Sequence, residues 1–184
     1  MRVIAGKAKG KRLVAPKSMH TRPTTDKVKE AIFSMIGYID EEDKALDLFS
    51  GTGGMGIEFL SRNAKEVVFI DNNAESIRCI RENVSGCKLD SQSRIYKQEV
   101  AKAIKILHLN HEKFSFIFLD PPYEKALVKE VLDLLKEMPI LTDEGIIIAE
   151  HEKQLVIEDD ECFEVTKRKE YGDIAVSFLA YREE

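Results

Sequence analysis

The stretch Ala45-Leu-Asp-Leu-Phe-Ser-Gly-Thr-Gly-Gly-Met-Gly56 decides the fold of this chain. Its first five residues predict a buried strand, and the glycine turn that follows opens a helix. Gly51, Gly53 and Gly56 fit the spacing G-x-G-x-x-G, and Asp71 follows Gly51 by twenty positions. Such glycines let a ligand approach the backbone, and a carboxylate at that distance accepts hydrogen bonds from ribose hydroxyls. The spacing alone therefore indicates a dinucleotide site at the end of the first strand.

Strand and helix patterns alternate on both sides of this stretch. Strands are predicted at 45–49, 66–71, 94–97, 114–119 and 145–150, and the helices between them at 54–62, 74–84, 100–109 and 125–137. Strands that are apolar throughout favour a parallel sheet with both faces covered. Two later runs, 162–169 and 173–182, are joined at Tyr171-Gly172 and predict an antiparallel hairpin on the sheet edge. The expectation is an α/β fold with a seven-stranded, mostly parallel sheet.

The first forty residues differ in charge from the rest. Residues 1–30 carry nine lysines and arginines against two carboxylates, although the whole chain has a net charge of −5. Residues 2–15 predict a short hairpin, and Thr24-Thr25-Asp26 offers helix caps before an apolar stripe that ends at Ile39. We expect a basic N-terminal arm with a docking helix over 1–40, and one compact domain over 41–184. A basic arm on an acidic body indicates a polyanionic partner, with a solvated tail as the alternative.

Bulk composition narrows the class of protein. The chain has 184 residues, of which 43% are hydrophobic, enough for one domain with a sizeable core. No apolar run approaches the ~18 residues of a membrane span, and the basic N-terminus lacks the apolar region of a secretory signal. The three cysteines stand apart, which favours reduced thiols in a cytoplasmic protein, and we expect no metal site because no cluster of histidines and cysteines is present.

A carboxylate inside the first strand argues against a dinucleotide. Asp47 stands four residues before Gly51, beside the expected turn. A carboxylate repels a pyrophosphate but attracts a ligand that carries an ammonium and a sulfonium group. S-adenosylmethionine carries both, and its ribose hydroxyls suit Asp71. We therefore interpret the turn as an S-adenosylmethionine site, with a tight turn that binds no ligand as the alternative.

A second motif, Asp120-Pro-Pro-Tyr123, follows the fourth predicted strand. Two prolines fix the backbone and remove two donors, which leaves carbonyls and side chains as lining groups. The Asp120 carboxylate and the Pro121 carbonyl are two acceptors for the two hydrogens of an exocyclic amine, and Tyr123 offers an aromatic face. Alone the motif could be a rigid turn, but its place on the same rim as the glycine turn indicates a site for an amino group.

These motifs together resemble class I S-adenosylmethionine-dependent methyltransferases that act on amino groups. Arg2–Leu13, Arg22–Phe33, Leu46–Arg62 and Tyr171–Asp173 narrow the resemblance to the RsmD family, bacterial methyltransferases of a guanine N2 in 16S ribosomal RNA. The resemblance extends from residue 2 to about residue 182. It implies a Rossmann-like methyltransferase fold, S-adenosylmethionine as the cofactor, and 16S rRNA in an assembled or assembling small ribosomal subunit as the partner.

The resemblance also implies roles for individual residues. Those that would hold the target guanine are Asp120, Pro121, Pro122 and Tyr123. Those that would hold the cofactor are Asp47, Phe49, Gly51, Thr52, Gly53, Asp71, Asn72, Glu99 and Val100. Those that would hold RNA are Lys7, Lys9, Lys11, Arg12, Arg22 and Thr24. Glu99 departs from the family, which more often has Asp or Asn near the adenine, so a solvated glutamate at a helix start is the alternative there.

Other functions share part of this pattern. A DNA adenine-N6 or protein-glutamine methyltransferase would share the core, although the chain has no room for the target-recognition insert of a DNA enzyme. A nicotinamide oxidoreductase shares only the glycine spacing. A non-catalytic RNA-binding module would keep the arm but has no need for both rim motifs. The guanine-N2 methyltransferase accounts for all of these features together.

Overall fold

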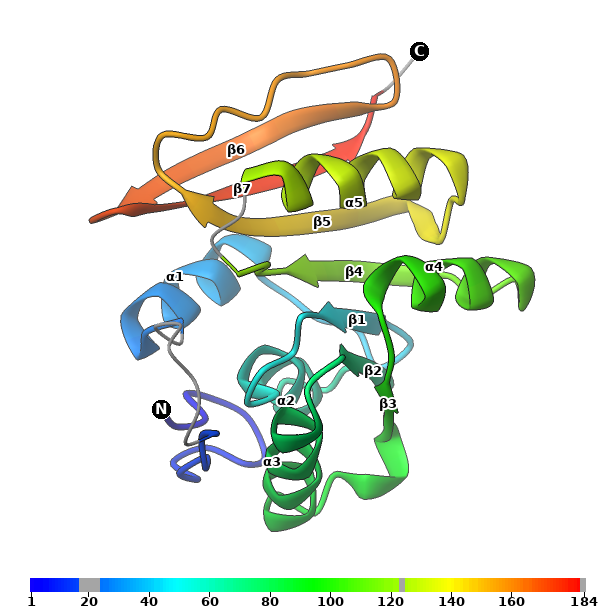
Figure 1. The fold of residues 1–184 in the computed structure, drawn as a ribbon. Coiled ribbons are helices and arrows are strands. Elements are labelled where there is room, and N and C mark those ends of the chain that lie inside the picture. Colours follow the sequence, from blue (N-terminus) through cyan, green and yellow to red (C-terminus); the bar gives the residue numbers. More distant parts are fainter. Residues whose placement is uncertain (17–23, 123–124, 183–184) are drawn as a thin grey trace.

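A single mixed sheet forms the centre of the molecule (Figure 1). The computed structural model describes residues 1–16, 24–122 and 125–182. The strands run in the order β3-β2-β1-β4-β5-β7-β6, and β1 to β5 are mutually parallel. Their bounds are β1 Lys44–Leu48, β2 Glu66–Asp71, β3 Ser93–Lys97, β4 Phe114–Leu119, β5 Leu141–Glu152, β6 Phe163–Tyr171 and β7 Ile174–Tyr181. This is the seven-stranded, Rossmann-like arrangement with an antiparallel C-terminal hairpin that the sequence predicted.

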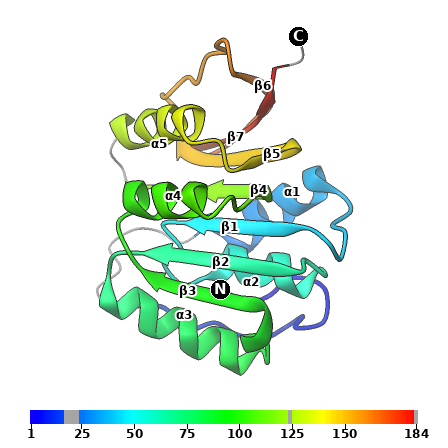
Figure 2. The same cartoon turned by 90° about the vertical axis from the view of Figure 1, so that its right-hand side faces the viewer.

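Helices cover both faces of the sheet, as the uniformly apolar strands require. One core cluster joins the sheet to α1 (Asp26–Ile36), α2 (Gly54–Ser61) and α3 (Ala74–Gly86). The other joins it to α4 (Val100–Leu109) and α5 (Lys125–Glu137). Figure 2, turned from the first view, shows α1 and α2 on the opposite side of the sheet from α4 and α5. A short 3-10 turn, η1 Asp90–Gln92, precedes β3.

Several element ends differ from the sequence prediction by one or two residues, and three differences are larger or change a turn. β5 begins at Leu141 rather than Gly145, because its pairing with β4 shifts register between Phe114 and Phe116 and so takes in a polar segment. The C-terminal hairpin turns after Tyr171 rather than at it. In the N-terminal arm the predicted hairpin is reduced to one isolated bridge, Arg2 with Arg12. The arm is therefore a compact loop and not a two-stranded ribbon.

The register of the strands brings three carboxylates to one edge. Asp47 pairs with Phe118, and Phe118 pairs with Ile148. Side chains alternate between faces, so Asp120 and Glu150, two residues further on, project to the same face as Asp47. This is the face that α1 and α2 cover, at the carboxyl ends of the parallel strands, where ligands of such sheets bind.

Candidate active site

The glycine turn between β1 and α2 has the backbone that its sequence requires. Gly51 and Gly53 have φ of 55° and 75°, a region that favours glycine. A Cβ on Gly56 would lie 2.2 Å from the ring of Phe69, so this third glycine lets α2 approach β2. The three glycines thus shape the turn and its packing, and leave the backbone at Gly51 and Gly53 free of side chains.

Asp47 is the buried carboxylate of this turn. It is only 2% exposed, and its Oδ2 accepts a hydrogen bond of 2.9 Å from the Gly56 N–H. Burial raises the pKa of Asp47 to about 8, against the lowering effect of that bond. In the free protein one hydrogen bond offsets only part of the effect of burial on this carboxylate. The site therefore suits a cationic ligand, because the ligand's charge would favour the ionised form.

Asp71 and Glu99 extend the site along the same edge. Asp71 Oδ2 accepts from the Gly51 N–H at 2.9 Å, and its Oδ1 accepts from the Asn73 N–H at 2.8 Å. Burial raises the pKa of the Asp71 carboxyl. The Asn72 side chain donates to Glu99 Oε1 at 3.1 Å, while Glu99 makes no cap bond to its own helix α4. The structure thus joins Asn72 and Glu99, two residues that the sequence prediction placed at the cofactor.

The hydrophobic members of the predicted cofactor group, Phe49 and Val100, contact the core on the α4 and α5 face of the sheet. Phe49 has φ of 59° and is half-buried, and Val100 begins α4. Both pack partly against the core cluster of α4 and α5, and Phe49 also lines the cavity at the glycine turn.

One cavity unites the glycine turn with the Asp-Pro-Pro motif. It encloses about 380 Å³, including the part open to solvent. Asp47, Gly51 and Thr52 line it together with Asp120, which follows β4. The full lining is Met1, Thr24, Lys29, Asp47, Phe49, Ser50, Gly51, Thr52, Gly54, Met55, Phe118 and Asp120. The cavity therefore brings four of the predicted cofactor residues, Asp47, Phe49, Gly51 and Thr52, together with Asp120 of the predicted catalytic group.

Asp120 is the acidic residue of the second motif. Burial and the charges of Glu150 and then Asp47 hold its pKa well above the usual range of a carboxyl. Pro121 is buried and Pro122 exposed, as expected for a rigid segment that leaves the sheet. Tyr123 lies outside the described residues.

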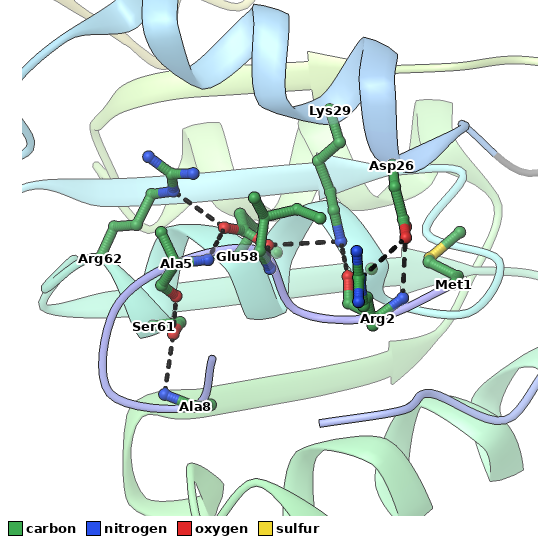
Figure 3. Close-up of polar contacts among 12 residues, drawn as sticks. Met1, Arg2, Ala5, Ala8, Asp26, Lys29, Glu58, Ser61 and Arg62 are labelled. Carbon is green, nitrogen blue, oxygen red and sulfur yellow. Dashed lines mark hydrogen bonds and ion pairs between the residues drawn. The ribbon is translucent and has the colours of Figure 1, made fainter. Parts of the chain in front are cut away.

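The basic arm docks on the body of the protein, in contrast to the solvated-tail alternative (Figure 3). Glu58, on α2, accepts from the backbone N–H groups of Ile4 and Ala5 at 2.9 and 3.0 Å. Lys29 Nζ, from α1, lies 3.3 Å from Glu58 Oε2 and donates to the Arg2 carbonyl at 2.5 Å. The side chains of Lys29 and Glu58 are completely buried, so this pair fastens the arm to both helices.

Further bonds fix the arm along α2. Ser61 Oγ accepts from the Ala8 N–H at 2.9 Å and donates to the Ala5 carbonyl. A Cβ on Gly6 would lie 1.7 Å from the Ser61 carbonyl oxygen, so only glycine permits this approach. At the start of the arm, Met1 lines the cavity, with its sulfur 3.5 Å from Thr52 Oγ1. The arm is thus a wall of the site.

The basic side chains of the arm remain at the surface. Lys7, Lys9, Lys11 and Arg12 are exposed, and Lys7 Nζ donates to Gln92 Oε1 at 2.7 Å. Arg22 lies outside the described residues. The prediction groups Thr24 with the RNA-binding residues, but the structure buries it at the cavity, where its hydroxyl donates to Glu150 Oε2 at 2.7 Å.

Sequence reasoning missed several residues of the site. No short motif indicates a role for these residues, and the residues that they contact are remote in sequence. They are Met1, Lys29, Glu58 and Glu150. One signal was present: Glu58 is the only charged residue in the eight-residue helix α2. A lone charge in an apolar helix indicates a buried pair.

The described residues contain neither a metal-binding group nor a membrane-spanning helix. Among residues 1–16, 24–122 and 125–182, no three His, Cys, Asp or Glu side chains are grouped as metal ligands. Within the same ranges no helix is long and apolar enough to cross a membrane.

Comparison with known proteins gives a consistent family. The family model described as Conserved hypothetical protein 95 matches residues 1–180. The chain is 38% identical to "Putative rRNA methyltransferase YlbH" of Bacillus subtilis, over 99% of this chain and 100% of that protein. It is 32% identical to "Ribosomal RNA small subunit methyltransferase D" of Haemophilus influenzae, over 99% of this chain and 93% of that protein. The crystal structure of the putative methylase HI0767 from Haemophilus influenzae superposes with a TM-score of 0.80 at 27% identity, over 100% of this chain and 99% of that one. With its glycine turn, its Asp-Pro-Pro motif and these likenesses over nearly its whole length, the chain belongs to the RsmD family.

Proposed function

We propose that this protein transfers a methyl group from S-adenosylmethionine to the exocyclic N2 amine of a specific guanine in 16S rRNA of the small ribosomal subunit. The observation that carries the proposal is the shared cavity, in which Asp47 of the glycine turn and Asp120 of the Asp-Pro-Pro motif line one space. Relatives named as rRNA methyltransferases support an RNA substrate.

The residues present fit S-adenosylmethionine. Asp47, buried and with a raised pKa, suits the ligand's positive charges, and Gly51 and Gly53 leave room for its methionine part. Asp71 would accept from the ribose hydroxyls, with Asn72 and Glu99 beside it toward the adenine. The cofactor supplies an electrophilic methyl group when it is bound.

The chain's own contribution to the reaction is placement of the amine. The guanine N2 lone pair is delocalised into the ring, which makes the nitrogen a poor nucleophile. Acceptors at Asp120 and the Pro121 carbonyl would bind the amine hydrogens, turn the lone pair toward the methyl group and favour the positive charge that develops on nitrogen. Tyr123 would stack on the extruded base, a contact worth ~1–3 kcal/mol on other stacking platforms.

The arm supplies the RNA contact in this proposal. Lys7, Lys9, Lys11 and Arg12 present their charges at the surface of a docked arm, and Arg22 would add another. Because Met1 of the same arm lines the cavity, RNA held by these side chains would lie next to the site. A ribosomal substrate would be met in the cytoplasm, with 1–40 acting as the RNA-binding extension and 41–184 as the methyltransferase domain.

Small ribosomal subunits from cells that lack the protein provide the test. The purified protein and methyl-labelled S-adenosylmethionine should add one methyl group to one guanine N2, located by mass spectrometry of RNA fragments. Asp120→Ala should lower the rate by about 10²–10³-fold, since it removes a group aimed at developing charge. Its affinity for S-adenosylhomocysteine should be nearly unchanged. Labelling of DNA adenine or of a protein glutamine instead, or tighter binding of NAD than of S-adenosylhomocysteine, would contradict the proposal.

A further inference from the structure

Glu150, at the carboxyl end of β5, is a buried carboxylate to which the reaction above assigns no role. The residue is 5% exposed. Its Oε2 accepts the 2.7 Å hydrogen bond from the Thr24 hydroxyl, and no other residue in the described part of the chain donates to its carboxylate. Because Thr24 and Asp120 line the cavity and Glu150 does not, Glu150 lies behind the cavity wall.

Strand register places Glu150 beside Asp120. Leu119 and Ala149 are register partners on the parallel strands β4 and β5. Asp120, just past the end of β4, and Glu150, still within β5, therefore come next at the same level and on the same face. Such strands are ~4.8 Å apart. A carboxylate on each of two neighbouring strands at one level opposes ionisation of the other. In agreement, the charge of Glu150 adds to burial in raising the pKa of Asp120, while the Thr24 bond opposes the effect of burial on the pKa of Glu150.

The groups that face this pair leave its negative charge without a local counterion. Asp47 faces it from β1 and adds a further carboxylate. Lys29 lines the cavity from α1, but its ammonium is engaged with Glu58 and with the arm. His151 follows Glu150 on the opposite face of β5 and bonds to Ser177. No cation among the described residues is therefore placed to balance the pair, and a cationic ligand in the cavity would do so.

We propose that Asp120 and Glu150 share one proton, and that the pair loses or gains this proton according to the charge of the bound ligand. In this pair Glu150 is a positioning residue that acts through Asp120. The pair holds one proton while no cation is in the cavity, releases it when a sulfonium binds, and regains a proton from the methylated amine. The inference rests on the proposed function and explains why a carboxylate is buried behind the Asp-Pro-Pro motif.

The charges balance over one turnover. The electron pair of the amine nitrogen forms the new N–C bond, and the S–C electron pair stays on sulfur, so one positive charge passes from sulfur to nitrogen. The nitrogen then gives a proton to Asp120, which lines the cavity, and becomes neutral. The pair again holds one proton, with the charge of Glu150 stabilised by the Thr24 hydroxyl. No further reactant is needed.

Calorimetric titration of the whole protein at pH 7 tests this inference without catalysis. The heat of binding is measured in two buffers of different ionisation enthalpy, which gives the number of protons released. S-adenosylmethionine should release up to about one proton more than S-adenosylhomocysteine, which has the ammonium but no sulfonium. Both ligands carry the same ammonium group, so any protons released in response to it are equal for the two ligands. They cancel when one proton release is subtracted from the other.

Three variants locate the source of the extra proton. Glu150→Gln keeps the side-chain volume and an acceptor for Thr24, and should abolish the difference between the two ligands. Asp120→Asn should do the same. Glu164→Gln is the control and should retain the full difference. Glu164 lies on the edge strand β6 opposite Ala180, whereas Glu150 lies opposite Val176, near the other end of β7.

Each outcome separates the inference from the function on which it rests. Binding of both ligands to the unchanged protein with equal proton release would overturn the inference alone. Retention of the difference in either Glu150→Gln or Asp120→Asn would also overturn it. Failure of both ligands to bind would overturn the proposed function and the inference together.

Discussion

Substitution of Lys29 by methionine should destabilise the protein strongly, although only one side chain of α1 changes. The Lys29 ammonium lies 3.3 Å from Glu58 Oε2, and both side chains are completely buried. The same ammonium donates to the Arg2 carbonyl and so holds the arm. Methionine has a similar length but no charge, so the variant leaves Glu58 buried without its cation.

The structure sets the expected magnitude. Removing one partner of a buried ion pair costs about 3–5 kcal/mol, because the remaining charge stays buried. Glu58 keeps two backbone N–H donors from the arm and the Nε of Arg62 at 2.9 Å, which places this loss near the lower limit, about 3 kcal/mol. The unpaired Arg2 carbonyl adds about 1 kcal/mol. A total near 4 kcal/mol corresponds to a fall in Tm of about 10 °C for a chain of this size.

Urea denaturation followed by circular dichroism measures the effect. Lys65→Met is the matched control, because Lys65 forms an exposed ion pair with Glu42 and should leave the denaturation midpoint unchanged. The double variant Lys29→Met/Glu58→Gln should lose less stability than the sum of the single changes, because neither charge remains buried alone. A loss in Lys29→Met as small as that in Lys65→Met would refute the buried-pair argument.

Three further predictions follow from the site. The pKa of Asp47 in the folded protein, about 8, lies above its usual value of 3.8, so the folded state binds more protons between these values and its stability should fall as pH rises from about 4 to about 8. Asp47→Asn should remove this part of the pH dependence of stability in thermal melts and weaken S-adenosylhomocysteine binding. Gly56→Ala should destabilise by about 1–3 kcal/mol through overpacking, whereas Gly86→Ala, with open space around its Cβ, should not; persistence of the wild-type Tm in both would contradict the packing argument. Lys9→Ala and Lys11→Ala should weaken RNA binding and reduce the slope of log affinity against log salt, measured by filter binding, and an unchanged slope would remove these side chains from the RNA contact.

Much of the fold followed from local pattern. The strands β2 and β4 and the helices α4 and α5 have the bounds that the sequence predicted, because their apolar pattern is strong and polar residues stand at their ends or directly beside them. β5 was predicted too short because Thr142, Asp143 and Glu144 are polar. Their pairing depends on a register shift against β4, which is a property of two strands and not of one.

The site was predictable where one segment carries its own geometry. The glycines of the turn and the prolines of the Asp-Pro-Pro motif each predict a particular backbone conformation from sequence alone. The topology of the sheet then brings the two segments to one edge. The docking of the arm was not predictable in this way. Glu58 and Lys29 each look like one polar residue on a helix, and only the fold places them in contact across 29 positions of sequence. The Thr24 bond to Glu150 spans 126 positions and leaves no local trace.

The first turns of α1 connect the basic arm to the candidate active site. Thr24 stands just before this helix and bonds to Glu150, while Lys29, one turn into it, holds both Glu58 and the arm. A displacement of the arm by RNA would therefore act on α1 through Lys29 and on the Asp120–Glu150 pair through Thr24. Truncation of the arm is for that reason a poor test of RNA binding, because it would remove the Met1 wall and two of the donors to Glu58 along with the charges. Single substitutions of Lys9 and Lys11 separate the two roles, since they change the surface charge proposed to meet RNA and leave in place the docking bonds of the arm to Glu58 and Ser61.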